Sequence, residues 1–331
     1  NRCEGQGVSF LIKFILKRLA MMIPVLIGVS FIIFAMMYFT PGDPAQVILG
    51  DMATEEDLEL FRAENGLNGG FLEQYVYYMK NVVTKGDLGT SYTTKQPATG
   101  ELLDRFPTTF KLAGISIIIS VIIGIVVGII SATRQYSIFD NVCTIFSLIG
   151  VSMPNFWQGM ILIIFFSVYM GWFPPSGFST PLHWVLPAIT IGTSQAANIM
   201  RMTRSSMLEV IRQDYIRTAR AKGQKESVVI WKHALKNALI PIITVVGLSF
   251  GRLLGGAVLT ESIFSIAGIG KLMVDSIKLK NYPMVQGGVL FIAFVMCIVN
   301  LLVDILYAYA DPKIRSLYVK PGILKRRMRR E

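Results

Sequence analysis

The sequence predicts an all-α integral membrane protein with six transmembrane helices, a long first extracytoplasmic loop and a short cytoplasmic helix. Hydrophobic residues make up 53% of the 331 residues and charged residues only 16%, whereas soluble domains carry about 25% charged residues. A helix needs about 20 apolar residues to cross a bilayer, and the chain has six such stretches. The charged residues are also sorted between the connecting segments, as they are in multi-pass proteins.

The apolar stretches fix the order of the chain. They cover 14–39, 106–132, 139–170, 184–207, 236–260 and 286–309. Lys13, Lys17 and Arg18 lie at the start of the first stretch, and short segments rich in Lys and Arg stay in the cytoplasm. We therefore expect a cytoplasmic N-terminus, an outer loop over 40–105 and a cytoplasmic tail. Of the 32 Lys and Arg, 22 then lie on the cytoplasmic side, and 11 of the 21 acids lie in the first outer loop.

Charge and cysteine content exclude several classes of protein. The net charge of +11 would suit a nucleic-acid partner, but its distribution follows the topology, so we expect none. Cys3, Cys143 and Cys297 are an odd number without metal-site spacing, and the two histidines lie far apart. We expect no disulfide framework and no metal site. The first apolar stretch is too long for a removable signal peptide, and because the chain starts with Asn1 its true N-terminus stays open.

The chain carries no motif for ATP hydrolysis. The stretch 266–271 (IAGIGK) is similar to a phosphate loop, but a Walker A motif needs Gly-x4-Gly-Lys-Ser/Thr. Here Ser265 stands in place of the first glycine, and Leu272 follows the lysine. We therefore predict that the protein is not an enzyme and that any energy source is a partner.

Two short helices are predicted in the first outer loop. Thr54 and Asp57 form a capping-box-like start and Gly66 a stop, which predicts a helix over 55–65. A second amphipathic helix has its apolar positions at Leu72, Tyr75, Val76, Met79 and Val83. The loop is either a cap over the bundle or a docking surface for a substrate-delivering protein, since long structured loops are often functional.

Small residues within the apolar stretches predict close helix contacts. Gly124 and Gly128 form a GxxxG pair, and Gly247, Gly251 and Gly255 repeat this spacing in the fifth stretch. Glycines at this spacing let helix backbones approach closely. We expect them to serve packing rather than chemistry.

Polar residues in the third to fifth stretches predict a pathway lining. Ser152-Met-Pro-Asn155 predicts a kink or a break, and broken backbone at membrane depth must be buried or face a water-filled cavity. Arg252 either snorkels outward or lines the pathway. The alternative is that the polar groups of these residues are hydrogen-bonded between helices. The candidate lining residues are Pro154, Asn155, Ser194, Gln195, Asn198 and Arg252.

One acid lies in the last apolar stretch. Asp304 shares a helix face with Asn300 and Asp311 near the cytoplasmic end. Charges within a membrane are costly and face inward, so we expect Asp304 to pair with a residue of the basic loop rather than to bind substrate. Asp304 and Arg252 do not form a proton relay.

The loop 209–241 holds the densest basic block between two apolar stretches. Nine Lys and Arg and three acids lie between Arg201 and Lys236. Four residues fall at i, i+3, i+4 and i+7 and so share one face of a short helix: Tyr215, Thr218, Ala219 and Lys222. Gly223 is placed to end this helix in a left-handed conformation. The segment suits either a solvated basic loop that attracts anionic lipid or a slim helix that a partner protein grips.

This loop resembles the EAA loop of ABC-importer permeases, and more narrowly the peptide/nickel permease subfamily. The resemblance rests on DYIRTARAKG at 214–223 followed by HALKNALIP at 233–241. The chain departs from the general motif, because Thr-Ala-Arg at 218–220 stands where the family has Glu-Ala-Ala, and the spacing from glycine to proline is longer. Further stretches resemble the first permease of dipeptide and oligopeptide importers: RLAMMIP at 18–24, PGDP at 41–44, GDLGTSY at 86–92, RFPTT at 105–109, MPNFW at 153–157, GGAVLTE at 255–261, GIG at 268–270 and YADPK at 309–313.

The resemblance covers nearly the whole chain and implies its architecture and partners. It implies the type I ABC-importer permease fold, with the first span and outer loop over 1–105, a core over 106–311 and a basic tail over 312–331, in a bacterial or archaeal cytoplasmic membrane. The implied partners are a second homologous permease, two ATP-binding subunits, an extracytoplasmic binding protein, a peptide substrate and membrane lipid. ATP and Mg would bind to the ATPase subunits, and this chain would bind no cofactor. The coupling residues would be Asp214, Tyr215, Thr218, Ala219, Arg220, Ala221, Lys222 and Gly223.

Other substrates and other classes stay open. Nickel, glutathione and oligosaccharides are alternatives within the family, and the scarcity of His and Cys disfavours nickel. A secondary transporter driven by an ion gradient is the alternative from another class, although six spans, no internal repeat and few intramembrane acids disfavour it. A scaffold without transport would leave the kinked third and polar fourth stretches unexplained.

Overall fold

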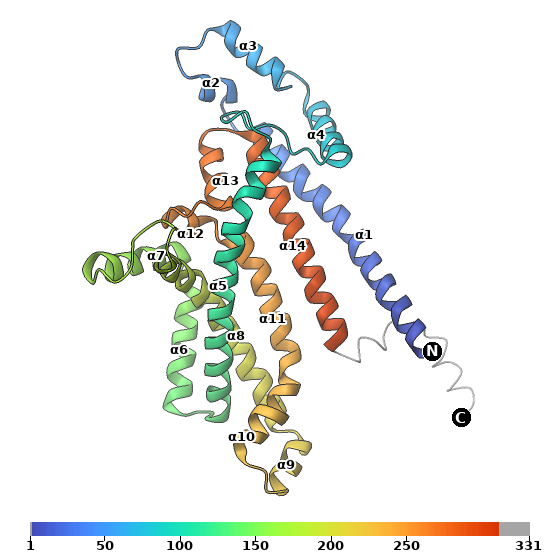
Figure 1. The fold of residues 1–331 in the computed structure, drawn as a ribbon, viewed down its shortest axis with the longest axis vertical. Coiled ribbons are helices and arrows are strands. Elements are labelled where there is room, and N and C mark those ends of the chain that lie inside the picture. The colour runs from blue at the N-terminus through green and yellow to red at the C-terminus, as the bar shows by residue number, and fades with distance from the viewer. Residues whose placement is uncertain (1, 311–331) are drawn as a thin grey trace.

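The computed structural model describes residues 2–310, and their side chains over 14–255 and 257–306. These residues form a bundle of long helices with a helical cap at one end (Figure 1). The predicted all-α fold is confirmed, since the extended pairing in the described part is one isolated bridge, between Thr90 and Pro97. The predicted tail over 312–331 lies outside the described residues.

Four helical stretches of the described chain are long and apolar enough to cross a membrane. They are Phe14–Phe39 in α1 (Arg2–Phe39), Ala98–Thr133, which is α5, Glu226–Gly255, and Tyr282–Leu306 in α14 (Tyr282–Ala310). The third of these joins α10 (Glu226–Val228), the π-helical segment η3 (Val229–Ala234) and α11 (Leu235–Gly256). All four correspond to predicted spans, although α5 begins eight residues before 106 because its polar first turns continue the helix beyond the apolar stretch.

The third predicted span is broken, as expected. It is divided into α6 (Ile138–Ser152) and α7 (Asn155–Leu162), which continues as the π-helix η1 (Ile163–Tyr169), and the two parts are bent by 106°. Met153 and Pro154 between them have extended backbone, with ψ of 123° and 133°, because proline disfavours the helical conformation of the residue before it. As a result α7 turns sideways from the bundle (Figure 1).

The fourth predicted span is α8 (Val185–Ile211), which follows a 3₁₀ turn, η2 (Pro181–Trp184). α8 is long enough to cross a membrane, but its polar residues make it less apolar than the other spans. The described residues therefore contain four apolar spans, or five if the bent pair counts as one, rather than the six predicted. α8 packs against α5, α6, α7 and α11. A helix that is surrounded by other helices can carry polar groups that a lipid-facing helix cannot.

The predicted glycine contacts are confirmed. A Cβ atom on Gly128 of α5 would lie 2.6 Å from Cβ of Thr203, and one on Gly124 would lie 2.8 Å from Cβ of Ile199, so α5 and α8 cross at their backbones. Three glycines of α11 face α14, and at Gly247 a Cβ atom would lie 2.2 Å from Val303: Gly247, Gly251 and Gly255. The small residues therefore allow α5 to approach α8, and α11 to approach α14, closely.

The cap consists of α2 (Pro44–Leu49), α3 (Glu55–Glu64) and α4 (Phe71–Lys85). The predicted capping box is present: the Thr54 hydroxyl accepts from the amide of Asp57, and the Asp57 carboxylate accepts from the amide of Thr54. The Thr54 hydroxyl also donates to the Asp57 carboxylate, and this bond, together with the one from the Thr54 amide, holds the pKa of Asp57 below its ordinary value. Gly66 has φ +67°, which fits the predicted helix stop.

The second cap helix exists as predicted, but its apolar face is not buried as a unit. The Tyr75 ring packs edge-on against Phe34 of α1 at 5.3 Å, and its hydroxyl lies 3.0 Å from the Ser30 hydroxyl. Leu72, Val76 and Val83 instead stay 67%, 63% and 75% exposed. Aromatic contacts determine how α4 packs on α1. Helical periodicity marks aromatic and aliphatic residues alike as apolar, so it does not show which of them will make the contact.

Asp304 has a different partner from the one expected. Its carboxylate lies 2.9 Å from the Arg18 guanidinium of α1, so the pair joins α1 to α14 rather than α14 to the basic loop. The two helices pack along their lengths, and this brings Arg18 to the acid. Asp311, which was expected on the same face, lies outside the described residues.

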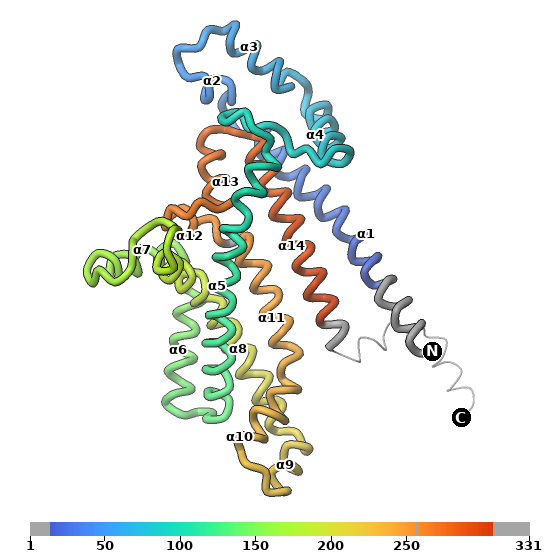
Figure 2. The backbone as a smooth tube through the Cα atoms, in the orientation of Figure 1, coloured from blue at the N-terminus to red at the C-terminus, as the bar shows by residue number. Residues whose placement is uncertain are grey.

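A buried carboxylate organises the end of the bundle nearest the cap. There α12 (Val258–Ile263) and α13 (Ile269–Lys278), which connect α11 to α14 in the chain, lie at the cap end of the bundle (Figure 2). Glu261 is fully buried and accepts from the Thr109 hydroxyl at 2.7 Å and from the Lys271 amide at 3.1 Å. Burial raises the pKa of Glu261, and these donors offset part of the rise. The carboxylate thus ties α12 to α5 and to the start of α13.

Replacing Glu261 with Gln should destabilise the chain by about 1–3 kcal/mol, because one acceptor oxygen becomes an amino group that faces a donor. The measurement is thermal or denaturant unfolding of the purified chain in mild detergent. Glu59→Gln is the control, since Glu59 is exposed on the cap. Equal stability of the two variants would show that the Glu261 contacts are not needed.

Candidate coupling site and pathway residues

The basic loop lies at the end of the bundle opposite the cap. It contains α9 (Asp214–Ala221), which follows α8 after two residues, and it returns to the bundle through α10 and η3 (Figure 1). A short helix is therefore present where the sequence predicted one. It projects beyond the ends of α5 and α6 in Figure 1.

One apolar side chain anchors α9. Ile216 is fully buried in a cluster with residues of α5, α8, η3 and α11. Met207 of α8, Val229 of η3 and Ala238 of α11 belong to the same cluster. Ile216 therefore places α9 in one apolar cluster with residues of the bundle helices, and a displacement of α9 would disturb this cluster.

Ile216 is not among the site residues predicted from the sequence, although the sequence contains a signal for it. It is the one aliphatic residue larger than alanine between Asp214 and Gly223. The predicted common face is not the inward one: Ala219 is half-buried beside Ile216, but Tyr215, Thr218 and Lys222 are exposed. The inward face of so short a helix is decided by a single contact, and spacing alone does not identify it.

Polar contacts hold the rest of the loop in place. Arg220 donates to both carboxylate oxygens of Glu226, at 3.1 and 2.7 Å. The Asn237 side-chain amide donates to the Tyr215 hydroxyl at 2.8 Å. These contacts connect α9 to α10 and to the first turn of α11, and so close the loop on itself.

Gly223 ends α9 in the predicted left-handed conformation. Its φ is +74°, and a Cβ atom there would meet nothing within 4 Å. The Gly223 amide donates to the Arg220 carbonyl at 2.9 Å. The position therefore requires glycine for its backbone conformation and not for space.

We expect Ile216→Ala to weaken the attachment of α9 by about 2–5 kcal/mol, since it removes a fully buried aliphatic side chain. Because α9 is a surface helix, the effect should be local: faster amide hydrogen exchange over 213–224 with little change in α5. Ile243→Ala on α11 is the matched control, since that side chain is 38% exposed. Uniform loosening of the whole chain would contradict this role of Ile216.

The candidate pathway residues lie on several helices of the described structure. On α8, the Ser194 hydroxyl donates to the Ile191 carbonyl of its own helix at 3.4 Å, and Asn198 accepts from Arg201 at 3.0 Å. The side-chain oxygen of Gln195 is buried without a hydrogen-bond partner among the described residues. Ser194 and Asn198 are thus hydrogen-bonded within their own helix, whereas Gln195, like Thr203 of the same helix, is buried without a hydrogen-bond partner among the described residues.

The remaining candidates lie on other helices. Pro154 and Asn155 form the corner between α6 and α7. Arg252 is exposed on α11 and has no ion-pair or hydrogen-bond partner in the described part of the chain. A hollow of about 930 Å³ lies instead beneath the cap, with Tyr38 and Tyr78 in its wall. None of the six candidates lines that hollow.

Sequence profiles identify the family of this chain. Residues 124–316 match the profile described as "binding-protein-dependent transport system inner membrane component". The chain belongs to this family. Residues 11–113 match the profile of the N-terminal part of such membrane components, so both the core and the outer-loop region are covered. The chain is a permease, the non-catalytic membrane subunit of an ABC importer.

Curated relatives of this permease match 92% of its length. It is 42% identical to the dipeptide transport system permease protein DppB of Alkalihalophilus pseudofirmus, over 92% of this chain and 100% of that one. It is 41% identical to the di/tripeptide transport system permease protein DppB of Pseudomonas aeruginosa, over 92% and 99%. It is also 41% identical to the glutathione transport system permease protein GsiC of Pectobacterium atrosepticum, over 92% and 99%.

A solved structure shares the fold of the permease. A chain of the inward-facing MetNI methionine ABC transporter superposes with a TM-score of 0.52 at 20% identity, over 64% of this chain and 97% of that chain. At this level of identity the likeness concerns the fold alone. The type I importer architecture implied by the sequence resemblance is thus confirmed.

Proposed function

We propose that this permease forms half of the translocation pathway of an ATP-driven importer of dipeptides and oligopeptides. The other half would come from a second, homologous permease, and two ATPase subunits that bind ATP and Mg would supply the energy. An extracytoplasmic binding protein would deliver the peptide on the side of the cap. The charge distribution supports a cytoplasmic membrane location with both termini inside, because 22 of 32 Lys and Arg then face the cytoplasm.

The observation that carries the proposal is the anchorage of α9. An exposed, charged helix whose Ile216 is buried in one apolar cluster with residues of α5, α8, η3 and α11 is suited to pass movement from a partner into the membrane. We infer that Asp214, Tyr215, Thr218, Ala219, Arg220, Ala221, Lys222 and Gly223 form the surface that meets the ATPase. When ATP draws the ATPase subunits together, α9 would be displaced, and α8 and α11 would follow.

A pathway through the half-site would involve α7, α8 and α11. Gln195, whose side-chain oxygen is without a partner, and Arg252, whose charge is unpaired among the described residues, support this assignment best. Pro154, Asn155, Ser194 and Asn198 complete the proposed lining. An unpaired arginine in the outer half of the pathway would attract a peptide carboxylate, since guanidinium groups bind carboxylates with two hydrogen bonds.

Glutathione is the second candidate substrate, because a glutathione permease is as similar to this chain as one of the dipeptide permeases, at 41% identity. Both compounds are short peptides with free carboxylates. Competition between labelled dipeptide and unlabelled glutathione would separate the two.

The proposal is tested by isolating the permease from native membranes in mild detergent, identifying the chains that accompany it, and reconstituting the complex. We expect two ATPase subunits, a second permease, and uptake of labelled dipeptide that requires ATP and binding protein and resists ionophores. A chain that purifies alone and moves solute on an ion gradient would overturn the proposal.

A further inference from the structure

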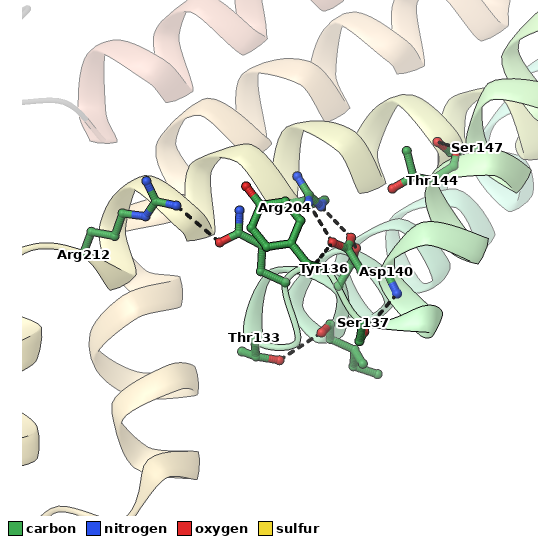
Figure 3. Close-up of polar contacts among 11 residues, drawn as sticks. Thr133, Tyr136, Ser137, Asp140, Thr144, Ser147, Arg204 and Arg212 are labelled. Atoms are coloured by element: carbon green, nitrogen blue, oxygen red, sulfur yellow. Dashed lines mark hydrogen bonds and ion pairs between the residues drawn. The ribbon is translucent and has the colours of Figure 1, made fainter.

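An ion pair between a buried aspartate and a half-buried arginine fastens the turn between α5 and α6 to α8. Figure 3 shows Asp140, in the first turn of α6, and Arg204, on α8, with their charged groups facing each other. The Nε and Nη2 atoms of Arg204 donate to the two carboxylate oxygens of Asp140, each at 2.7 Å. Such two-point pairing fixes orientation as well as distance.

Asp140 satisfies its remaining hydrogen-bonding capacity with neighbours on two further elements. The Ser131 hydroxyl at the end of α5 donates to one carboxylate oxygen, and the Tyr136 amide in the turn donates to the other at 2.9 Å. Asp140 is only 1% exposed. One carboxylate therefore holds together α5, the turn, α6 and α8.

The turn itself depends on this carboxylate. Tyr136 has φ +63°, a left-handed backbone conformation that bulky residues such as tyrosine rarely adopt. Its amide is held by Asp140, and the Gln135 side chain beside it accepts from Arg212, at the end of α8, at 3.3 Å. The turn is thus joined to the last part of α8 at two points, at Arg204 through Asp140 and at Arg212.

The Asp140–Arg204 pair fixes the orientation of α6 and the turn, which the packing of α5 on α8 does not fix. The close contact of Gly128 with Thr203 and the apolar cluster around Met207 already hold these two helices together. A buried ion pair contributes little net stability compared with apolar side chains of the same size, but it demands one geometry. Its effect here is to fix the position of α6 and the turn relative to the segment of α8 that leads into α9.

We propose that Asp140 and Arg204 are a positioning pair that makes α6 move with the cytoplasmic half of α8, so that displacement of α9 also reaches the bent α6–α7 segment. This inference rests on the proposed coupling role of α9. Without the pair, α9 and α8 would still respond to the ATPase, but the corner at Pro154 would not follow. ATP would then be consumed with less transport.

The test uses the complete reconstituted complex with Arg204→Lys, which keeps the charge but loses the two-point geometry. We expect uptake per ATP hydrolysed to fall by about tenfold, a size typical of coupling between sites, at near-normal ATPase activity and yield. Arg134→Lys is the matched control, since Arg134 lies exposed in the same turn. Unchanged uptake per ATP in Arg204→Lys, or a parallel loss of both activities and of yield, would overturn the inference.

A second measurement follows the movement itself. Spin labels at Ile138→Cys on α6 and Leu302→Cys on α14, both at exposed side chains, report on α6, and a label at Arg217→Cys paired with Leu302→Cys reports on α9. When Asp140 and Arg204 are both present, we expect both distances to change on addition of ATP. In Arg204→Lys we expect only the α9 distance to change. An α6 distance that still changes in Arg204→Lys would overturn the positioning role alone. An α9 distance that never changes with ATP would overturn the proposed coupling function together with it.

Discussion

Gly223→Val is expected to lower ATP-driven uptake by about tenfold while the transporter still assembles. Valine would have to adopt φ +74°, which costs L-residues about 1–2 kcal/mol and a β-branched residue more. An energy of this size changes the population of a conformation by about 5- to 30-fold. Because a Cβ atom at this position meets nothing, the end of α9 would be displaced without a clash in the bundle. Uptake and ATPase activity of the reconstituted complex are measured together.

Gly223→Asn is the control for this prediction. Asparagine adds a side chain of similar size but tolerates the left-handed conformation. It should therefore retain most of the uptake. Native uptake in Gly223→Val would show that the end of α9 does not transmit movement, and equal loss in both variants would assign the effect to side-chain bulk rather than to backbone conformation.

Gly128→Val should prevent the chain from folding stably. The added side chain would enter the space of Thr203 and the Met200 carbonyl, which a Cβ atom alone would already approach to 2.6 and 2.8 Å. Overpacking costs about 1–3 kcal/mol even where side chains can yield, and here α5 would have to move away from a backbone carbonyl. Yield, monodispersity in detergent and thermal unfolding are the measurements.

Gly114→Val provides the matched control on the same helix, because a Cβ atom there meets nothing within 4 Å. It should fold with near-native stability. If Gly128→Val and Gly114→Val were equally stable, the close crossing of α5 and α8 would not be the basis of the bundle.

Local features of the fold could be predicted from the sequence, because each has a cause within a few residues. The capping box at Thr54, the break at Pro154 and the left-handed Gly223 all follow from the conformational preferences of one or two residues. The glycine crossings follow from regular spacing. The polar character of α8 could also be read from the sequence. That this span depends on neighbouring helices rather than on its own apolar residues could not, because the sequence does not show which helices surround it.

Contacts between distant segments could not be predicted in this way. Arg18 meets Asp304 across 286 residues, and Arg204 meets Asp140 across 64, and no periodicity relates such positions. The direction of α4 on α1 depends on which aromatic residues find a partner. In the candidate site, the sequence located α9 and its end, but the buried anchor Ile216 was missed because a helix of eight residues offers too few turns for a face to be identified.

The most direct test of the central claim is cross-linking from α9 to the ATPase in the assembled complex. Cysteine would replace Thr218 on the exposed side of α9, after replacement of Cys3, Cys143 and Cys297, and Glu56→Cys on the cap would serve as the control position. We predict a cross-link from position 218 to an ATP-binding subunit, at a yield that changes when ATP binds, and none from position 56. An assembled, active complex in which position 218 never cross-links to the ATPase would contradict the assignment of α9 as the coupling helix.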